Sequence, residues 1–168
     1  MTLFAPTSAW QKLQAWLFTP KENLLEFLIF RTALILFLNI TFFFVLHLLE
    51  QSSDLFSEQA LQLSKAAKQV SSWSDTVIIA PFLESLMILI LLKLGAWARL
   101  RTWGNCALCA FLMALLHVPA WGWLKLLPTF ISFTVYTSAY LAYYQRSRLL
   151  AFTMCMGLHV LNNGWVKG

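Results

Sequence analysis

Residues 76–92 read TVIIAPFLESLMILILL, and Glu84 is the only ionisable side chain in this stretch. A helix needs about 20 apolar residues to cross about 30 Å of hydrocarbon, so this segment and its flanks predict a membrane span. A carboxylate inside a span costs roughly 2.5–3.5 kcal/mol on insertion scales, and ionisable groups at this depth generally have a function. Glu84 is therefore the first candidate for a functional residue.

The composition is that of an integral membrane protein. The chain has 168 residues, of which 60% are hydrophobic and only 11% are charged, whereas a soluble domain carries about 25% charged residues. The formal charge of +5 is typical of basic cytoplasmic loops, and no basic run interleaved with aromatic residues indicates nucleic-acid binding. We therefore expect contact with a lipid bilayer and no nucleic-acid partner.

The hydrophobic pattern predicts an all-α fold, a polytopic membrane helical bundle of about five transmembrane helices. Residues 1–23 contain an interfacial helix, because apolar and polar side chains alternate there at helical spacing. The spans are predicted at residues 24–49, 76–94, 103–118, 123–144 and 149–165. Residues 50–75 form a polar, amphipathic connection that could act as a lid, and residues 76–168 form a four-span core within a single membrane domain.

Basic residues in the loops predict the orientation. By the positive-inside rule, short loops rich in Lys and Arg stay in the cytoplasm. This rule places the N-terminus in the cytoplasm and the C-terminus outside, because one side of the predicted bundle carries most of the cationic loop residues: Lys12, Lys21, Lys93, Arg99, Arg101, Arg146 and Arg148.

Polar side chains of three predicted spans converge on one layer in the outer half of the membrane. With a helical rise of about 1.5 Å per residue, Glu84 lies about 12 Å from the outer edge, His117 about 5–10 Å and His159 about 12–15 Å. Asn163 follows His159 by four residues and shares its helical face. Polar residues in spans often form only hydrogen bonds between helices, but agreement in depth across three helices favours a shared site.

One carboxylate, two imidazoles and an amide are sufficient for peptide hydrolysis by activated water. A desolvated carboxylate can act as general base near neutral pH, and a neighbouring imidazole can hold the attacking water. A second imidazole and an amide can donate hydrogen bonds to an oxyanion. The same set suits zinc, whose ligands include Glu and His. A proton site in a small transporter or channel is a further alternative, although the sequence has no second repeat half.

These residues lie in three motifs that resemble those of the CPBP family, the CAAX proteases and bacteriocin-processing enzymes also called the Abi family. That family has an EExxxR helix often preceded by Ala-Pro, then an FxxxH helix and an HxxxN helix. Here APFLE ends at Glu84, FLMALLH ends at His117, and HVLNN runs from His159 to Asn163. The motif order fits, as does the single span between the second and third motifs, and the resemblance covers residues 76 to 168.

Three positions depart from the family pattern. The second Glu of the first motif is Ser85, its Arg is Leu89, and the Phe of the second motif is Met113. A catalytically inactive binding or immunity protein on the same scaffold is therefore kept as an alternative.

The resemblance implies a glutamic-type intramembrane endopeptidase in a bacterial inner membrane. Glu84 and His117 would activate water, while His159 and Asn163 would stabilise the oxyanion. No cofactor is expected, and a zinc-dependent version is the alternative. Together with the loop charges, the resemblance implies a membrane-anchored or exported protein or peptide substrate that is cut near the outer face, such as one with a C-terminal sorting signal. The pattern leaves the oligomeric state open.

Overall fold

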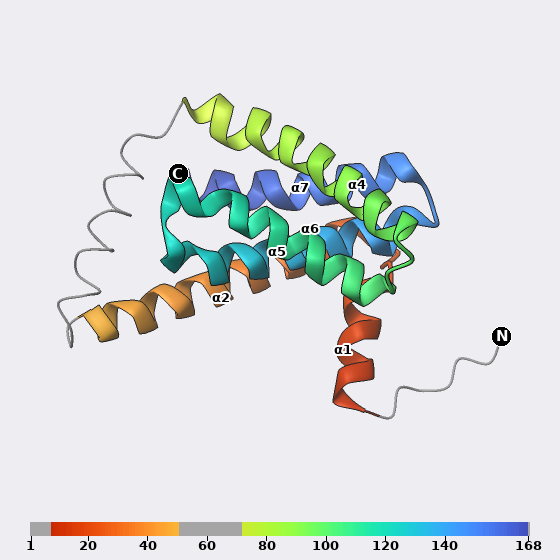
Figure 1. Ribbon diagram of the computed structural model, residues 1–168, viewed down its shortest axis with the longest axis horizontal. Coiled ribbons are helices and arrows are strands. Elements are labelled where there is room, and N and C mark those ends of the chain that lie inside the picture. The colour runs from red at the N-terminus through yellow and green to blue at the C-terminus, as the bar shows by residue number, and fades with distance from the viewer. Residues whose placement is uncertain (1–7, 51–71, 168) are drawn as a thin grey trace.

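The computed structural model describes residues 8–50 and 72–167, and every regular element in this part of the chain is helical (Figure 1). The all-α prediction is confirmed for these residues. The predicted polar connection and lid, residues 50–75, falls almost entirely outside them. The elements are α1 (Ala9–Phe18), α2 (Leu24–Glu50), the π-helix η1 (Asp75–Ile79), α4 (Ala80–Trp97), α5 (Thr102–Trp121), the 3-10 helix η2 (Trp123–Lys125), α6 (Leu126–Tyr144) and α7 (Arg148–Lys167).

Three of the described helices are long and apolar enough to cross a membrane. They cover Leu24–Val45, Asp75–Trp97 and Thr102–Pro119, with mean hydropathies of 2.2, 2.3 and 1.3. The first of them turns large apolar side chains outward, since Phe30, Phe37 and Phe44 are 60–66% exposed. Such a surface requires lipid or a partner to cover it. A multi-pass membrane protein is thus supported, and the count of five spans stays a prediction.

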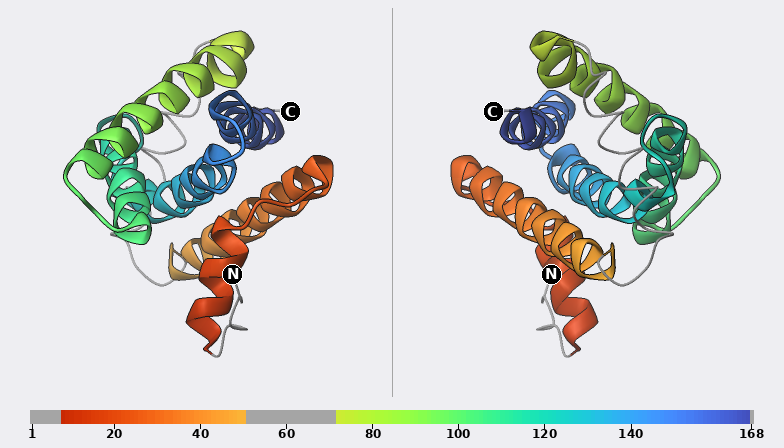
Figure 2. Two further views of the ribbon diagram at one scale, coloured as in Figure 1. Left: turned by 90° about the vertical axis from the view of Figure 1, so that its right-hand side faces the viewer. Right: turned by 90° about the vertical axis from the view of Figure 1, so that its left-hand side faces the viewer.

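Helix α6 is the centre of the bundle. Eleven of its residues are buried, and it contacts α1, α2, α5 and α7. Helix α7 lies between α4 and α2, as both end-on views show (Figure 2). Helices α4 to α7 pack on one another, and α2 packs against α6 and α7 and contributes Phe27 and Ile35 to the same hydrophobic core. The division into a four-span core at residues 76–168 stays a prediction.

The N-terminal helix is fixed to the bundle by a buried arginine. Ser8 and Gln11 form a capping box at the start of α1, with hydrogen bonds of 3.1 Å in both directions. Arg31 of α2 donates to the carbonyls of Trp16 and Leu17 at 2.6 and 3.1 Å. These carbonyls lie in the last turn of α1, where a helix has no backbone donors of its own. Sequence inspection did not single out Arg31.

The α4–α5 hairpin is held by a side-chain amide of α5 that donates to the backbone of α4. Asn105 donates from Nδ2 to the carbonyl of Leu92 at 2.8 Å. Its side chain packs so closely on Gly95 that a Cβ added there would overlap the amide. Glycine at this position therefore lets α5 approach the end of α4, and this approach sets α5 alongside the helix that carries Glu84.

Candidate functional site

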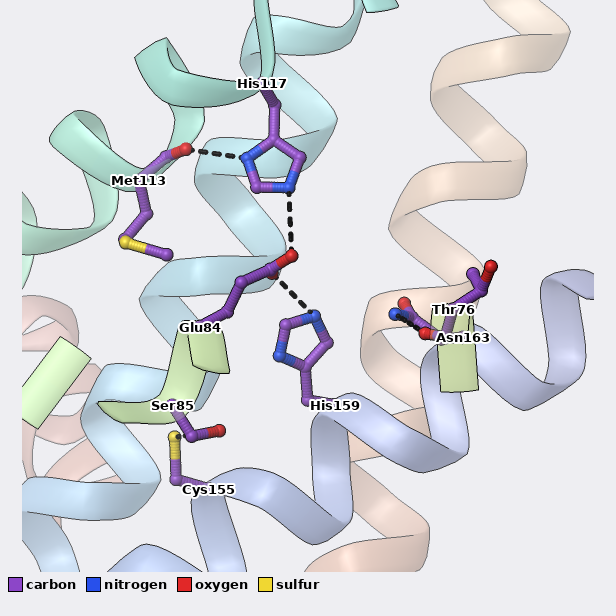
Figure 3. A network of polar contacts seen from close by, with 8 residues as sticks. All are labelled: Thr76, Glu84, Ser85, Met113, His117, Cys155, His159 and Asn163. Atoms are coloured by element: carbon purple, nitrogen blue, oxygen red, sulfur yellow. Dashed lines mark hydrogen bonds and ion pairs between the residues drawn. The ribbon is translucent and has the colours of Figure 1, made fainter. Parts of the chain in front are cut away.

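Glu84 lies between two histidines that come from different helices (Figure 3). Its Oε1 is 3.6 Å from Nε2 of His117 on α5, and its Oε2 is 3.2 Å from Nε2 of His159 on α7. The structure thus brings together three of the four residues that sequence analysis selected. The two histidines face different carboxylate oxygens, so a proton on either ring can be shared with Glu84.

The ring of His117 has a defined orientation. Its Nδ1 is 2.8 Å from the carbonyl of Met113, one turn earlier in α5. A carbonyl only accepts hydrogen bonds, so Nδ1 carries the proton and Nε2 is the atom that faces Glu84. At 3.6 Å the His117–Glu84 pair is too long for a strong direct hydrogen bond. A water molecule bound to both groups is compatible with this spacing.

The ring of His159 is held by aromatic side chains of α6. Tyr136 stacks on it with centroids 4.5 Å apart and an interplanar angle of 25°. Phe133 meets His159 edge-on at 5.5 Å and also contacts the His117 ring at 5.3 Å. The two α6 residues therefore form one wall of the site and restrict both imidazoles.

Sequence analysis missed this wall. Phe133 and Tyr136 are three residues apart and so share a helical face. They lie near the middle of the predicted fourth span, whereas aromatic residues in spans are enriched at the two interfaces. That unusual depth is the signal that would have identified them.

Solvent reaches the three ionisable side chains unequally. The Glu84 and His117 side chains are 20% and 24% exposed, whereas that of His159 is only 5% exposed. An incoming molecule can therefore approach Glu84 from the His117 side, with His159 behind it. Because His117 is more exposed than His159, the Glu84–His117 pair is more accessible to water than the Glu84–His159 pair.

Asn163, the fourth selected residue, has a different partner. Its Nδ2 donates to the backbone carbonyl of Thr76 at 3.0 Å, in the π-helix η1 that precedes α4 (Figure 3). Asn163 is on α7, one turn beyond His159. One of its two amide hydrogens is therefore engaged by the backbone, and the other is the one left for an oxyanion.

Two of the three positions that depart from the CPBP pattern, Ser85 and Leu89, are used for packing. Ser85 is 1% exposed, and its hydroxyl is 3.9 Å from Sγ of Cys155 on α7. Leu89 packs against the hydrophobic core. Among the contacts of the described residues, neither position faces a charged group that would pair with the Glu or Arg of the family pattern.

Within the described part of the chain, no group of three or more His, Cys, Asp or Glu side chains is arranged to hold a metal ion. Glu84 and the two histidines contact one another directly, whereas zinc ligands surround the ion at about 2.0–2.2 Å. The zinc-dependent version therefore needs its own experiment.

The chain matches no known family model, no curated protein and no solved structure. The resemblance to the CPBP family consequently depends on the three short motifs, and the function is inferred from the chemistry of the Glu84 site.

Proposed function

We propose that this protein is a multi-pass membrane endopeptidase that hydrolyses a peptide bond with water activated by Glu84. The observation that carries the proposal is the position of Glu84 between the Nε2 atoms of His117 and His159. Motifs resembling those of the CPBP family support the same assignment. A carboxylate held between two imidazoles can accept a proton from water and later return it.

In the proposed reaction, water binds between Glu84 and His117. Glu84 takes one proton as the water oxygen forms a bond to the scissile carbonyl carbon. His159 donates from Nε2 to the oxyanion, because a protonated Glu84 no longer competes strongly for that hydrogen. The carbon–nitrogen bond then breaks, and Glu84 returns the proton to the leaving amine. The products are a free carboxylate and a free amine.

The proposed substrate is a membrane-anchored or exported protein or peptide. With the N-terminus in the cytoplasm and the C-terminus outside, the site opens toward the outer half of a bacterial inner membrane. A C-terminal sorting signal with an apolar segment would reach this depth. Reporter fusions that place the C-terminus in the cytoplasm would contradict this part of the proposal.

Processing in cells tests the proposed activity. The membrane and secreted peptides of cells that express the wild type would be compared with those of cells that express Glu84→Gln. Gln keeps the size of the side chain but cannot accept the proton. The matched control is Glu26→Gln, which changes an exposed carboxylate on α2. We expect cleaved termini that depend on Glu84 and not on Glu26, and identical peptide profiles in all three strains would refute the activity.

The second candidate is a binding or immunity protein without catalysis on the same scaffold. Ser85 and Leu89 favour it, because these positions serve packing in place of the family's charged residues. This candidate predicts that a partner remains intact in the presence of the wild-type protein, and that Glu84→Gln changes neither binding nor protection.

A further inference from the structure

A second group of polar side chains lies where α2, α6 and α7 meet. Asn39 of α2 donates from Nδ2 to the hydroxyl of Ser132 on α6 at 3.4 Å, and that hydroxyl donates to the carbonyl of Pro128 at 3.0 Å. Tyr136 follows Ser132 by one turn, and its hydroxyl lies near the side chains of Ser132 and of Asn162 on α7. Tyr136 and Asn162 are only 1% and 8% exposed, so the protein encloses these polar groups.

Three oxygen atoms of this group have no direct hydrogen-bond partner among the described residues. They are Oδ1 of Asn39, Oη of Tyr136 and Oδ1 of Asn162, and all three are buried. Native proteins satisfy nearly all buried polar atoms, either with protein groups or with ordered water. Since α2, α6 and α7 each contribute one of the three oxygens, one small ligand at their junction would satisfy them together.

The donors and acceptors of the group match a water molecule. The amide oxygens of Asn39 and Asn162 only accept hydrogen bonds, whereas the hydroxyl of Tyr136 can donate one. A water molecule donates two hydrogen bonds and accepts the third, and a buried water typically makes about three. None of these side chains carries a charge, so the group suits a neutral ligand better than an ion, which would stay uncompensated.

We propose that Asn39, Tyr136 and Asn162 bind an ordered water molecule that joins α2 to α6 and α7. The water holds the hydroxyl end of Tyr136, and the ring of the same residue stacks on His159 at 4.5 Å. It therefore links α2 to one wall of the Glu84 site. The inference does not depend on the proposed hydrolysis, because the bound water would be present whatever reaction or binding the Glu84 site performs.

Radiolytic labelling of the purified wild-type protein in lipid nanodiscs tests the site. X-rays convert bound water into hydroxyl radicals, which oxidise neighbouring side chains, and mass spectrometry measures the oxidation rate of each residue. The control is Tyr143, which is also buried but whose hydroxyl bonds directly to the backbone N–H and carbonyl of Lys21. We expect Tyr136 to be oxidised several-fold faster than Tyr143, and equal rates would overturn the proposal.

A variant separates this water from any water at Glu84. Asn39→Leu keeps the size of the side chain, removes one partner of the proposed water and changes no residue of the Glu84 site. It should slow the oxidation of Tyr136 several-fold and leave that of His117 at the wild-type rate, because His117 faces Glu84. An unchanged rate at Tyr136, or an equal fall at both residues, would show that the labelling water is not bound at Asn39.

Thermal melts in detergent measure whether the polar groups share a ligand. A buried hydroxyl without a partner can be removed with no loss of stability, whereas one that bonds to an ordered water loses that bond. We expect Tyr136→Phe and Asn39→Leu each to lower the apparent Tm by about 2–10 °C. The double variant should lose less than the sum of the two, because both side chains depend on one water.

The matched control for the melts is Thr32→Val. Thr32 also has a buried hydroxyl oxygen without a partner in the described part of the chain, but it lies about 10 Å from Asn39 along α2. Its effect should therefore add to that of Tyr136→Phe. If Asn39→Leu does not fold, Asn162→Leu replaces it in both experiments. Additive losses for the Asn and Tyr136 variants, or an undiminished Tm in Tyr136→Phe, would rule out a shared water.

Discussion

Replacement of Arg31 by Met should release the N-terminal helix from the bundle. Arg31 is 2% exposed, donates to two carbonyls of α1, and stacks 3.8 Å above the Trp16 ring. Two hydrogen bonds from a charged donor contribute about 3–6 kcal/mol and the cation–π contact about 0.5–2 kcal/mol. Met is uncharged, so it avoids the cost of a charge in the membrane, and this offsets the loss by about 2.5–3.5 kcal/mol. We therefore expect Arg31→Met to weaken the docking free energy of α1 on the bundle by about 3 kcal/mol.

Hydrogen exchange of the α1 backbone amides measures this loss. Because about 1.4 kcal/mol corresponds to a factor of ten, protection of residues 13–17 should fall about a hundredfold in Arg31→Met. Arg101→Met is the control, since Arg101 is exposed and should leave α1 unchanged. Protection that stays within about threefold of the wild type would mean that α1 docks without the arginine, and it would rule out Arg31 as the residue that holds α1 on the bundle.

Three further predictions concern packing, the aromatic wall and metal. Gly95→Ala should lower the apparent Tm by about 2–10 °C through overlap with Asn105, whereas Gly104→Ala should not, because a Cβ there meets nothing within 4 Å; equal effects in a thermal melt would refute this explanation. Tyr136→Leu should reduce kcat about 2- to 13-fold by freeing the His159 ring, while Tyr136→Phe keeps the stack and most of the rate; equal rates would contradict a role for the ring. Chelators should leave cleavage unchanged, and activity lost on chelation and restored by zinc alone would establish the zinc-dependent version.

Helix positions were largely predictable because hydrophobic runs limit where helices begin and end. The predicted spans at residues 24–49, 103–118 and 149–165 correspond to α2, α5 and α7 within a few residues. The helical rise predicted a common depth for Glu84, His117 and His159, which is why their convergence could be inferred. The position of a residue along a helix axis follows from its place in the sequence and the rise per residue, so it can be predicted directly.

The rotation of each helix about its own axis was not predictable in the same way. Asn163 shares a face with His159 in an ideal helix, yet its amide donates to the backbone carbonyl of Thr76, which lies in the π-helix Asp75–Ile79. A π-helix inserts one residue and shifts the phase of everything after it, with no clear signal in an apolar run. The contacts of Arg31 and of the α6 wall were not predicted for a related reason, since their partners are backbone atoms and rings from distant segments.

Cleavage of a bilayer-anchored peptide by the purified protein in lipid vesicles tests the Glu84 mechanism most directly. The substrate would be one that depends on Glu84 in cells, and the measured quantity is kcat for the wild type, Glu84→Gln and Glu26→Gln. We expect a loss of about 10²–10⁴-fold for Glu84→Gln and a wild-type rate for Glu26→Gln. Glu84→Gln that cleaves at the wild-type rate would contradict the assignment of Glu84 as the general base.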